Sequence, residues 1–184
     1  MFRRIMAALL VAAPMGAAIG QSEGTGEWAL ATMPNGCMVQ ATSPQGTMIS
    51  IWGFAGQDKL AFLLQNRDWS VRDGQPYKLD LDFVGISSLP VNATARQHID
   101  SDGPGFLFTV KPGAQGASGF LAAFTSATGM RIEQNGQSFD TLPLAGSRTA
   151  MAALAKCLAD RWSKAPAAAA SQEDKSSSDD ATTI

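Results

Sequence analysis

The sequence predicts an α+β fold built mainly of antiparallel β-strands and hairpins, with one short helix and one C-terminal helix in a single domain. Three observations lead to this prediction. Apolar and polar residues alternate over much of the chain, as they do in strands with one buried face. Turn-forming residues separate these runs at short intervals. Apolar residues at helical spacing occur only late in the chain.

The composition supports a core of ordinary size and excludes a basic nucleic-acid binder. The chain has 184 residues, of which 45% are hydrophobic and 16% are charged. Its 14 Lys and Arg residues against 16 Asp and Glu residues give a formal charge of −2. A body so close to neutral does not attract nucleic acid electrostatically, so we expect no nucleic-acid partner.

The first 20 residues have the three parts of a secretory signal peptide. Arg3 and Arg4 form a basic start, residues 5–19 carry no charge, and small residues follow. We expect cleavage after Gly20, which leaves Gln21 as the first residue. The uncharged run is shorter than the roughly 20 residues that span a bilayer, so we expect no membrane span in the mature chain and a periplasmic or secreted location.

The rest of the chain divides by composition into three parts. Residues 21–27 are polar and rich in glycine, which predicts a flexible lead. Residues 28–164 form the α+β domain. Residues 165–184 are acidic, and their only large apolar residue is Ile184, so they are predicted to be a disordered tail.

The strands are predicted in chain order from alternation and from turn residues. A hairpin spans residues 28–43 around Pro34-Asn35-Gly36, where Gly36 is expected to supply a positive φ. The next runs, 47–54 and 59–64, are apolar at both odd and even positions, which predicts strands covered on both faces. Three further predicted strands are the alternating run 76–85 and the β-prone runs 89–96 and 106–110.

Two helices and one more hairpin complete the predicted domain. Ser118 is a candidate N-cap for a short helix that ends before Gly129. Asn135-Gly136 lies between two β-prone runs and is the strongest hairpin signal in the chain. A second helix is predicted to start at Ser147 and to stop before Pro166.

The two cysteines, Cys37 and Cys157, lie near opposite ends of the domain. In an exported chain such a pair predicts a disulfide, which ties the C-terminal helix to the first hairpin. Two buried free thiols are the alternative. A redox site is not expected, because the chain has no C-x-x-C motif. A zinc site is not expected either, because it would need two further ligands.

Only one conventional general base is present. His98 lies beside Asp100 and Asp102, which admits a hydrolase, and Asp100-Ser101-Asp102-Gly103 resembles part of a calcium loop. A polar loop that ends in Gly103-Pro104-Gly105 is the preferred interpretation. We therefore expect no catalytic residue, metal ligand or cofactor.

Other chemistry-bearing side chains are assigned to ordinary structural roles. Asp80 and Asp82 share the polar face of an alternating strand with Lys78, as expected for a solvated face. The four tryptophans could form a stacking platform, but core packing is the preferred role. Trp69 lies near a turn and is the one whose exposure most needs testing. The four are Trp28, Trp52, Trp69 and Trp162.

The layout resembles that of small uncharacterised exported proteins of Proteobacteria. The resemblance rests on Trp28 and Cys37, on the N-x-x-W run 66–69 with Tyr77 after it, and on the run LAGSRTAMAALAKC at 144–157. It implies an envelope location and no catalytic residues. The expected function is therefore that of an exported, non-catalytic binding or envelope-associated protein, whose partner is an unknown envelope protein or ligand. The alternatives are a hydrolase that uses His98 and a structural envelope component.

Overall fold

The computed structural model describes residues 27–97 and 103–163, and these form one α+β domain. The predicted fold class is confirmed. Nine strands form one antiparallel sheet in the order β1-β2-β3-β4-β7-β6-β5-β8-β9. The strands are β1 (Ala29–Met33), β2 (Gly36–Thr42), β3 (Met48–Phe54), β4 (Leu60–Gln65), β5 (Pro76–Phe83), β6 (Ser87–Arg96), β7 (Gly105–Val110), β8 (Gly129–Gln134) and β9 (Gln137–Pro143).

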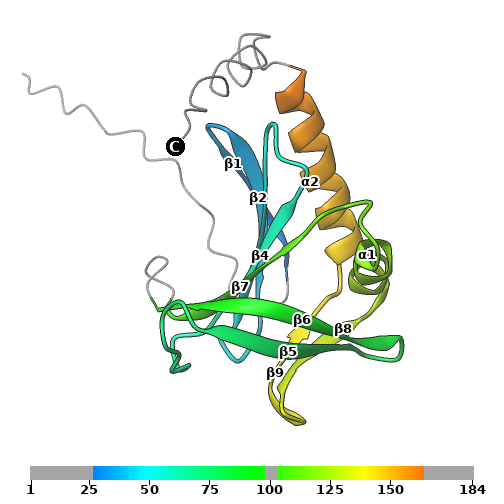
Figure 1. Ribbon diagram of the computed structural model, residues 1–184. Helices are drawn as coiled ribbons and strands as arrows, with labels where there is room; N and C mark the ends of the chain where they lie inside the picture. The colour runs from blue at the N-terminus through cyan, green and yellow to red at the C-terminus, as the bar shows by residue number, and fades with distance from the viewer. Residues whose placement is uncertain (1–26, 98–102, 164–184) are drawn as a thin grey trace, which may run out of the picture.

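Two helices lie on the same side of this sheet (Figure 1). The short helix α1 (Ala117–Ser126) buries Phe120 and Phe124, and the long helix α2 (Ser147–Trp162) buries Leu154. None of the described helices is long and apolar enough to cross a membrane.

The sheet is strongly bent, and its inner face holds the core. In Figure 1, β5 and β6 run across the direction of β1 and β2, so the two halves of the sheet wrap around the helices. Directly paired residues of neighbouring strands share a face, and the pairing of Val39 with Ile51 and of Ile51 with Phe62 continues to Phe108. Phe62 also meets Phe120 and Phe124 edge to face, with ring centroids 5.2 and 5.7 Å apart.

The bend brings the last strand of the sheet close to the turn between β2 and β3. The hydroxyl of Thr47 in that turn donates a hydrogen bond to the Asp140 carboxylate of β9. The same hydroxyl accepts a hydrogen bond of 2.7 Å from the side-chain amide of Asn66. Side chains therefore link the edge strand β9 to the turn between β2 and β3, although no strand pairing closes the sheet among the described residues.

One predicted turn and one predicted alternating strand form as the sequence indicates. Asn135 and Gly136 both have positive φ, at 53° and 76°, as a two-residue hairpin of the primed type requires. In β5, Leu79, Leu81 and Phe83 are fully buried on one face. The opposite face of β5 carries Asp82, which pairs with Arg131 of β8, as expected for a solvated surface.

Two local predictions are wrong. Gly36 does not have a positive φ, because the turn consists of Pro34 and Asn35 and Gly36 already belongs to β2. Glycine is required there for space, since a Cβ atom at Gly36 would lie 2.3 Å from the carbonyl oxygen of Gly53. Ser118 does not cap α1 either. The N-cap is Gly116 in a left-handed conformation, with no side-chain hydrogen bond.

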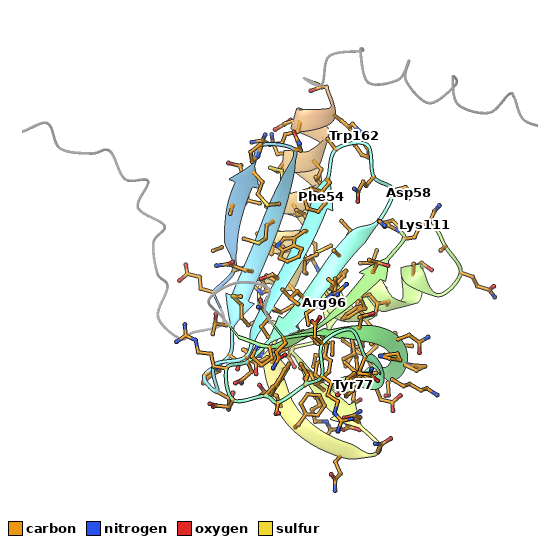
Figure 2. All side chains as sticks on the ribbon, turned by 60° about the vertical axis from the view of Figure 1, so that its left-hand side comes forward. Phe54, Asp58, Tyr77, Arg96, Lys111 and Trp162 are labelled. Atoms are coloured by element: carbon orange, nitrogen blue, oxygen red, sulfur yellow. A yellow bond between two sulfur atoms is a disulfide. The ribbon has the colours of Figure 1, made fainter. Side chains whose placement is uncertain are left out.

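The second face of β3 and β4 is only partly covered, so the expectation of strands buried on both sides holds in part. Ser50 and Leu63 are almost completely buried on this outer face. Trp52 and Phe54, however, are half-buried, and Figure 2 shows Phe54 on the side of the sheet away from α2. The outer face is therefore apolar in composition without being a second core.

Candidate functional site

The two edges of the sheet differ in a way that matters for binding. The edge strand β9 contains Asp140 and Pro143, and a β-bulge interrupts its pairing with β8. Charges, prolines and bulges are the devices by which sheet edges avoid pairing with another chain. The opposite edge strand, β1, has the sequence ALATM and contains none of them. Among the described residues no strand pairs with the outer side of β1.

The hairpin register determines which backbone groups of β1 face outward. Met33 and Gly36 flank the two-residue turn and therefore form a hydrogen-bonded pair. By alternation, Ala31 and Ala29 also bond to β2, so the backbone N–H and C=O groups of Leu30 and Thr32 point to the free edge. The side chains of Leu30 and Thr32 are both exposed. That of Leu30 is 48% exposed, which is unusual for a leucine in a strand.

A groove runs between β1 and α2 on the inner side of the sheet. It consists of two adjoining cavities of about 690 and 590 Å³, which share Leu30 and Ala153. The wall formed by the helix carries mainly small side chains. They are Ala150, Ala153 and Thr149, together with Ala145 and Gly146 just before the helix. The groove therefore offers shallow apolar depressions beside an open strand edge.

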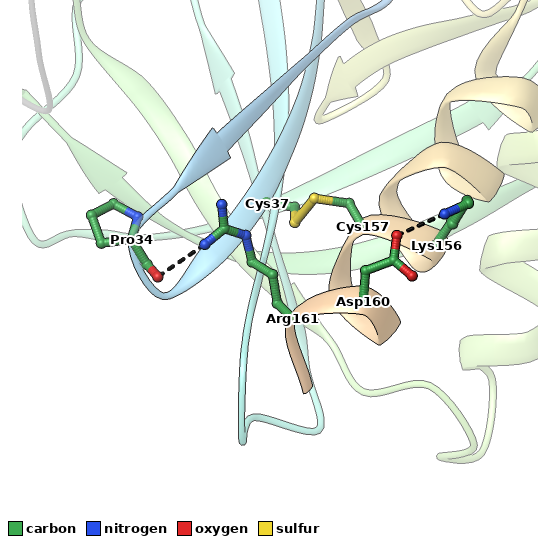
Figure 3. The surroundings of a disulfide bond; sticks show 6 residues. All are labelled: Pro34, Cys37, Lys156, Cys157, Asp160 and Arg161. Atoms are coloured by element: carbon green, nitrogen blue, oxygen red, sulfur yellow. Dashed lines mark hydrogen bonds and ion pairs between the residues drawn. A yellow bond between two sulfur atoms is a disulfide. The ribbon is translucent and has the colours of Figure 1, made fainter. Parts of the chain in front are cut away.

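The groove keeps its width because α2 is fixed at several points. The predicted disulfide between Cys37 and Cys157 is confirmed and joins α2 to β2, with the two Cα atoms 6.2 Å apart (Figure 3). At the end of α2, Nη1 of Arg161 donates a hydrogen bond of 3.1 Å to the carbonyl oxygen of Pro34. Before its start, Nε1 of Trp28 donates one of 3.1 Å to the carbonyl oxygen of Ala145.

The charges around the groove lie at its two ends. Glu27 lies at the Trp28 end, and Lys156, Asp160 and Arg161 lie at the Pro34 end. Nζ of Lys156 and the carboxylate of Asp160 form an ion pair of 2.7 Å within the helix, as Figure 3 shows. Since opposite charges are paired at that end, the middle of the groove is left to apolar contacts and to backbone hydrogen bonds.

Comparison with known proteins assigns no family. No protein-family model, curated protein or solved structure matches this chain. The functional interpretation therefore depends on the residues themselves.

The residues of the hydrolase alternative are not part of the described structure. His98, Asp100 and Asp102 lie outside the described residues, as do Gly20 and Gln21 at the predicted cleavage site and the tail 165–184.

The tryptophans do not gather into one platform. Trp28 packs edge to face on Phe124 with centroids 5.8 Å apart, and Trp69 packs on Phe106 at 5.3 Å. Trp162 lies at the end of α2 and is 52% exposed, so for this residue the expectation of core packing is wrong.

Sequence reasoning did not single out Leu30 and Thr32 as candidate site residues. The uncharged run ALATM and the more polar run QSFDTLP differ visibly in the sequence. This contrast becomes informative only once both runs are known to be edge strands, and the strand order is not readable from alternation. Leu30 was available in the sequence as an apolar residue of a predicted strand, but its exposure depends on where α2 lies.

Proposed function

We propose that this protein is an exported binding protein that takes up an extended polypeptide segment as an additional strand along β1. The observation that carries the proposal is the unguarded edge of β1 beside the groove. A row of outward N–H and C=O groups is matched by one kind of ligand, the backbone of another extended chain. The side chains of that segment would alternate between the groove and the outer face of the sheet.

The chemistry of the groove supports this mode of binding. In strand addition the backbone hydrogen bonds supply affinity and the depressions beside the strand supply selectivity. The small residues Ala150 and Ala153 leave room for side chains of the bound segment, and the exposed Leu30 favours apolar ones. Because the disulfide and the Trp28 and Arg161 contacts hold α2 in place, little ordering of the groove is required on binding.

The predicted signal peptide and the disulfide support an extracytoplasmic partner. The disulfide fits an oxidising compartment, and the predicted signal peptide provides the route to it. We propose a periplasmic or secreted location with Gln21 as the first residue of the mature chain. N-terminal sequencing of the protein recovered from the envelope or medium should begin at Gln21. A chain that still begins at Met1 would contradict this location.

The proposal is for binding without catalysis, with an unknown envelope protein as the partner. If the protein were instead a hydrolase that uses His98 with Asp100 or Asp102, its function would depend on His98 and not on the edge of β1. His98→Ala should leave peptide binding unchanged if the β1 edge is the site. Loss of binding in this variant, with the folded protein retained, would favour the hydrolase alternative.

The direct test uses a display library of ten-residue peptides selected against the mature protein. Thr32→Pro removes one outward N–H and keeps the hydrogen bonds to β2, so binding of the selected peptides should fall at least tenfold. The matched control is Thr141→Pro in β9, the opposite edge strand. The N–H of Thr141 donates a hydrogen bond to the carboxylate of its neighbour Asp140 within the same strand. That variant should bind normally.

Hydrogen exchange provides a second readout of the same site. The amides of Leu30 and Thr32 should exchange fast in the free protein and become protected when a selected peptide is bound. Equal binding to both threonine variants, or protection confined to other strands, would overturn the proposal.

A further inference from the structure

A second cavity lies away from the groove, at the end of the molecule where β5, β7 and the β8–β9 hairpin meet. Its volume is about 370 Å³, within the roughly 300–1,000 Å³ range of small-molecule sites. Its lining contains four aromatic residues and five polar ones. The aromatic residues are Trp69, Tyr77, Phe106 and Phe139, and the polar residues are Asp68, Ser70, Gln134, Gln137 and Ser138, with Val71 completing the lining.

The aromatic rings form a continuous apolar surface around Phe106. Phe106 is 4% exposed and forms the floor. Its ring centroid lies 5.3 Å from that of Trp69, 5.0 Å from that of Tyr77 and 6.0 Å from that of Phe139. Trp69 and Phe139 also meet edge to face at 5.2 Å. Trp69 and Tyr77 are half-buried and Phe139 is 37% exposed, so these three rings are accessible from the cavity.

Asn66 holds Asp68 and Trp69 in place. Its side-chain oxygen accepts a hydrogen bond of 2.8 Å from the backbone N–H of Asp68, and its backbone carbonyl accepts one of 3.2 Å from that of Trp69. Its side-chain nitrogen donates to Thr47 Oγ1 and to the carbonyl oxygen of Gln45. Asn66 is 7% exposed. The loop that presents Asp68 and Trp69 is therefore anchored by a buried amide, as a preformed site requires.

A β-bulge directs Phe139 into the same cavity. Ile132 pairs with Asp140 and Glu133 pairs with Ser138, so Phe139 is the extra residue of β9. Without the bulge, alternation would place Phe139 on the face opposite to that of Asp140. Bulges commonly redirect a side chain beside a functional site, and this one places Phe139 against Trp69 and Phe106.

The polar rim of the cavity is available to a ligand. Among the described residues, the side chains of Asp68, Gln134, Gln137 and Ser138 make no hydrogen bond to one another or to a neighbour. The amides both donate and accept, and the carboxylate accepts two hydrogen bonds. Among the described residues of the lining, Asp68 is the only charged one, and none of them is a cation that would pair with a phosphate or a carboxylate.

We propose that this cavity binds a ring of an uncharged oligosaccharide. A pyranose ring has a flat C–H face that packs on aromatic rings and a rim of hydroxyl groups that each donate and accept hydrogen bonds. The rings of Trp69, Tyr77 and Phe139 match the face, and the carboxylate and amides match the rim. A nucleotide or an acidic sugar fits less well, because its negative charge would lie beside Asp68 with no compensating cation in the described part of the lining.

This site is separate from the proposed peptide groove. Figure 2 shows Tyr77 at the end of the molecule opposite to Trp162, whereas the Pro34 end of the groove contacts Arg161 in the last turn of α2. The oligosaccharide site therefore does not depend on the proposed peptide binding, and Thr32→Pro should leave it unaffected.

The test is titration calorimetry of the mature protein with cellotriose, maltotriose and chitotriose, with trigalacturonate as the anionic comparison. We expect at least one neutral trisaccharide to bind and trigalacturonate to bind at least tenfold more weakly. Trp69→Ala and Phe139→Ala should each weaken binding of the neutral sugar at least tenfold, since they remove a stacking surface. Gln137→Ala should weaken it by a smaller factor.

Trp162→Ala is the matched control, because Trp162 is an exposed tryptophan outside the cavity. It should bind the sugar as the wild type does. Phe139 is exposed on a hairpin, so loss of binding in Phe139→Ala with an unchanged melting temperature separates recognition from folding. Failure of all three neutral sugars to bind, equal weakening by Trp162→Ala, or binding of a proline-rich peptide at Trp69 in place of a sugar would overturn the proposal.

Discussion

Asp140 is a single side chain whose contacts depend on the bend of the sheet. It belongs to β9, yet it accepts a hydrogen bond from Thr47 in the turn between β2 and β3. Burial in this position raises the pKa of its carboxyl group above the ordinary value, and the backbone N–H of Thr141 partly opposes that effect. The folded protein therefore binds a proton at Asp140 more tightly than the unfolded chain does.

This raised pKa predicts the stability of Asp140→Asn as a function of pH. Protonation of Asp140 adds stability that is fully present below the unfolded pKa of about 3.9 and is lost as the pH rises through the folded pKa. Asparagine resembles the protonated form, so Asp140→Asn should be at least as stable as the wild type at neutral pH. The difference should shrink on acidification, as measured by urea unfolding at several pH values.

Asp58 provides the control of opposite sign. A hydrogen bond and ion pair of 2.5 Å with Lys111, which Figure 2 shows beside it, hold the pKa of Asp58 below its ordinary value. Asp58→Asn should therefore remove a small stabilisation at neutral pH that fades as the pH falls. The same direction of change in both variants would contradict the assignment for Asp140.

At the scale of secondary-structure elements, α1 contains one glycine that no packing requires. A Cβ atom at Gly119 would meet nothing within 4 Å, and the residue lies in the first turn of the helix. Glycine in a helix interior is about 0.5–1 kcal/mol less favourable than alanine. Gly119→Ala in this first turn should therefore raise the free energy of unfolding by at most about 1 kcal/mol, as measured by chemical denaturation.

Gly36→Ala is the contrasting variant in a strand. Its Cβ atom would lie 2.3 Å from a backbone oxygen of the neighbouring strand, which cannot move aside as a flexible side chain can. This variant should lower the free energy of unfolding. The explanation is that a Cβ atom has free space at Gly119 and collides with backbone at Gly36. A neutral or destabilising effect of Gly119→Ala, or a neutral effect of Gly36→Ala, would contradict it.

The elements themselves were largely predictable, because each depends on short-range patterns. Alternation in β5, the Asn135-Gly136 turn and the start of α2 at Ser147 are all present in the structure. The N-cap at Gly116 was missed, since a left-handed glycine leaves no side-chain signal at the position where Ser118 offered one. The bulge at Phe139 was missed because it depends on how β9 fits its neighbour.

For the whole molecule, the disulfide is the covalent link between the two ends of the domain. It joins residues 120 positions apart, and in the loop-entropy model such a link stabilises by up to about 4.9 kcal/mol. The double variant Cys37→Ala/Cys157→Ala should therefore lower the free energy of unfolding by about 2–5 kcal/mol. Chemical denaturation of both proteins measures the difference.

Reduction of the wild type provides the control for this prediction. Because Cys37 is completely buried, replacing its sulfur also removes packing that reduction leaves in place. The reduced wild type should thus lie between the oxidised protein and the double variant. If both forms of the wild type unfold at the same denaturant concentration, the link does not stabilise the domain.

The sequence by itself determined the fold class, most strand and helix positions and the pairing of the two cysteines. These follow from local periodicity, from turn residues and from the presence of one cysteine pair. It also singled out Trp69 and the Asn66 run, although it did not show that Asn66 anchors the loop. The tertiary structure alone decided which strands are edges, where α2 lies beside β1, and which aromatic residues meet around Phe106. Those features depend on the order of strands in the sheet and on its bend, because they arise from contacts between residues far apart in the chain, which no local pattern records.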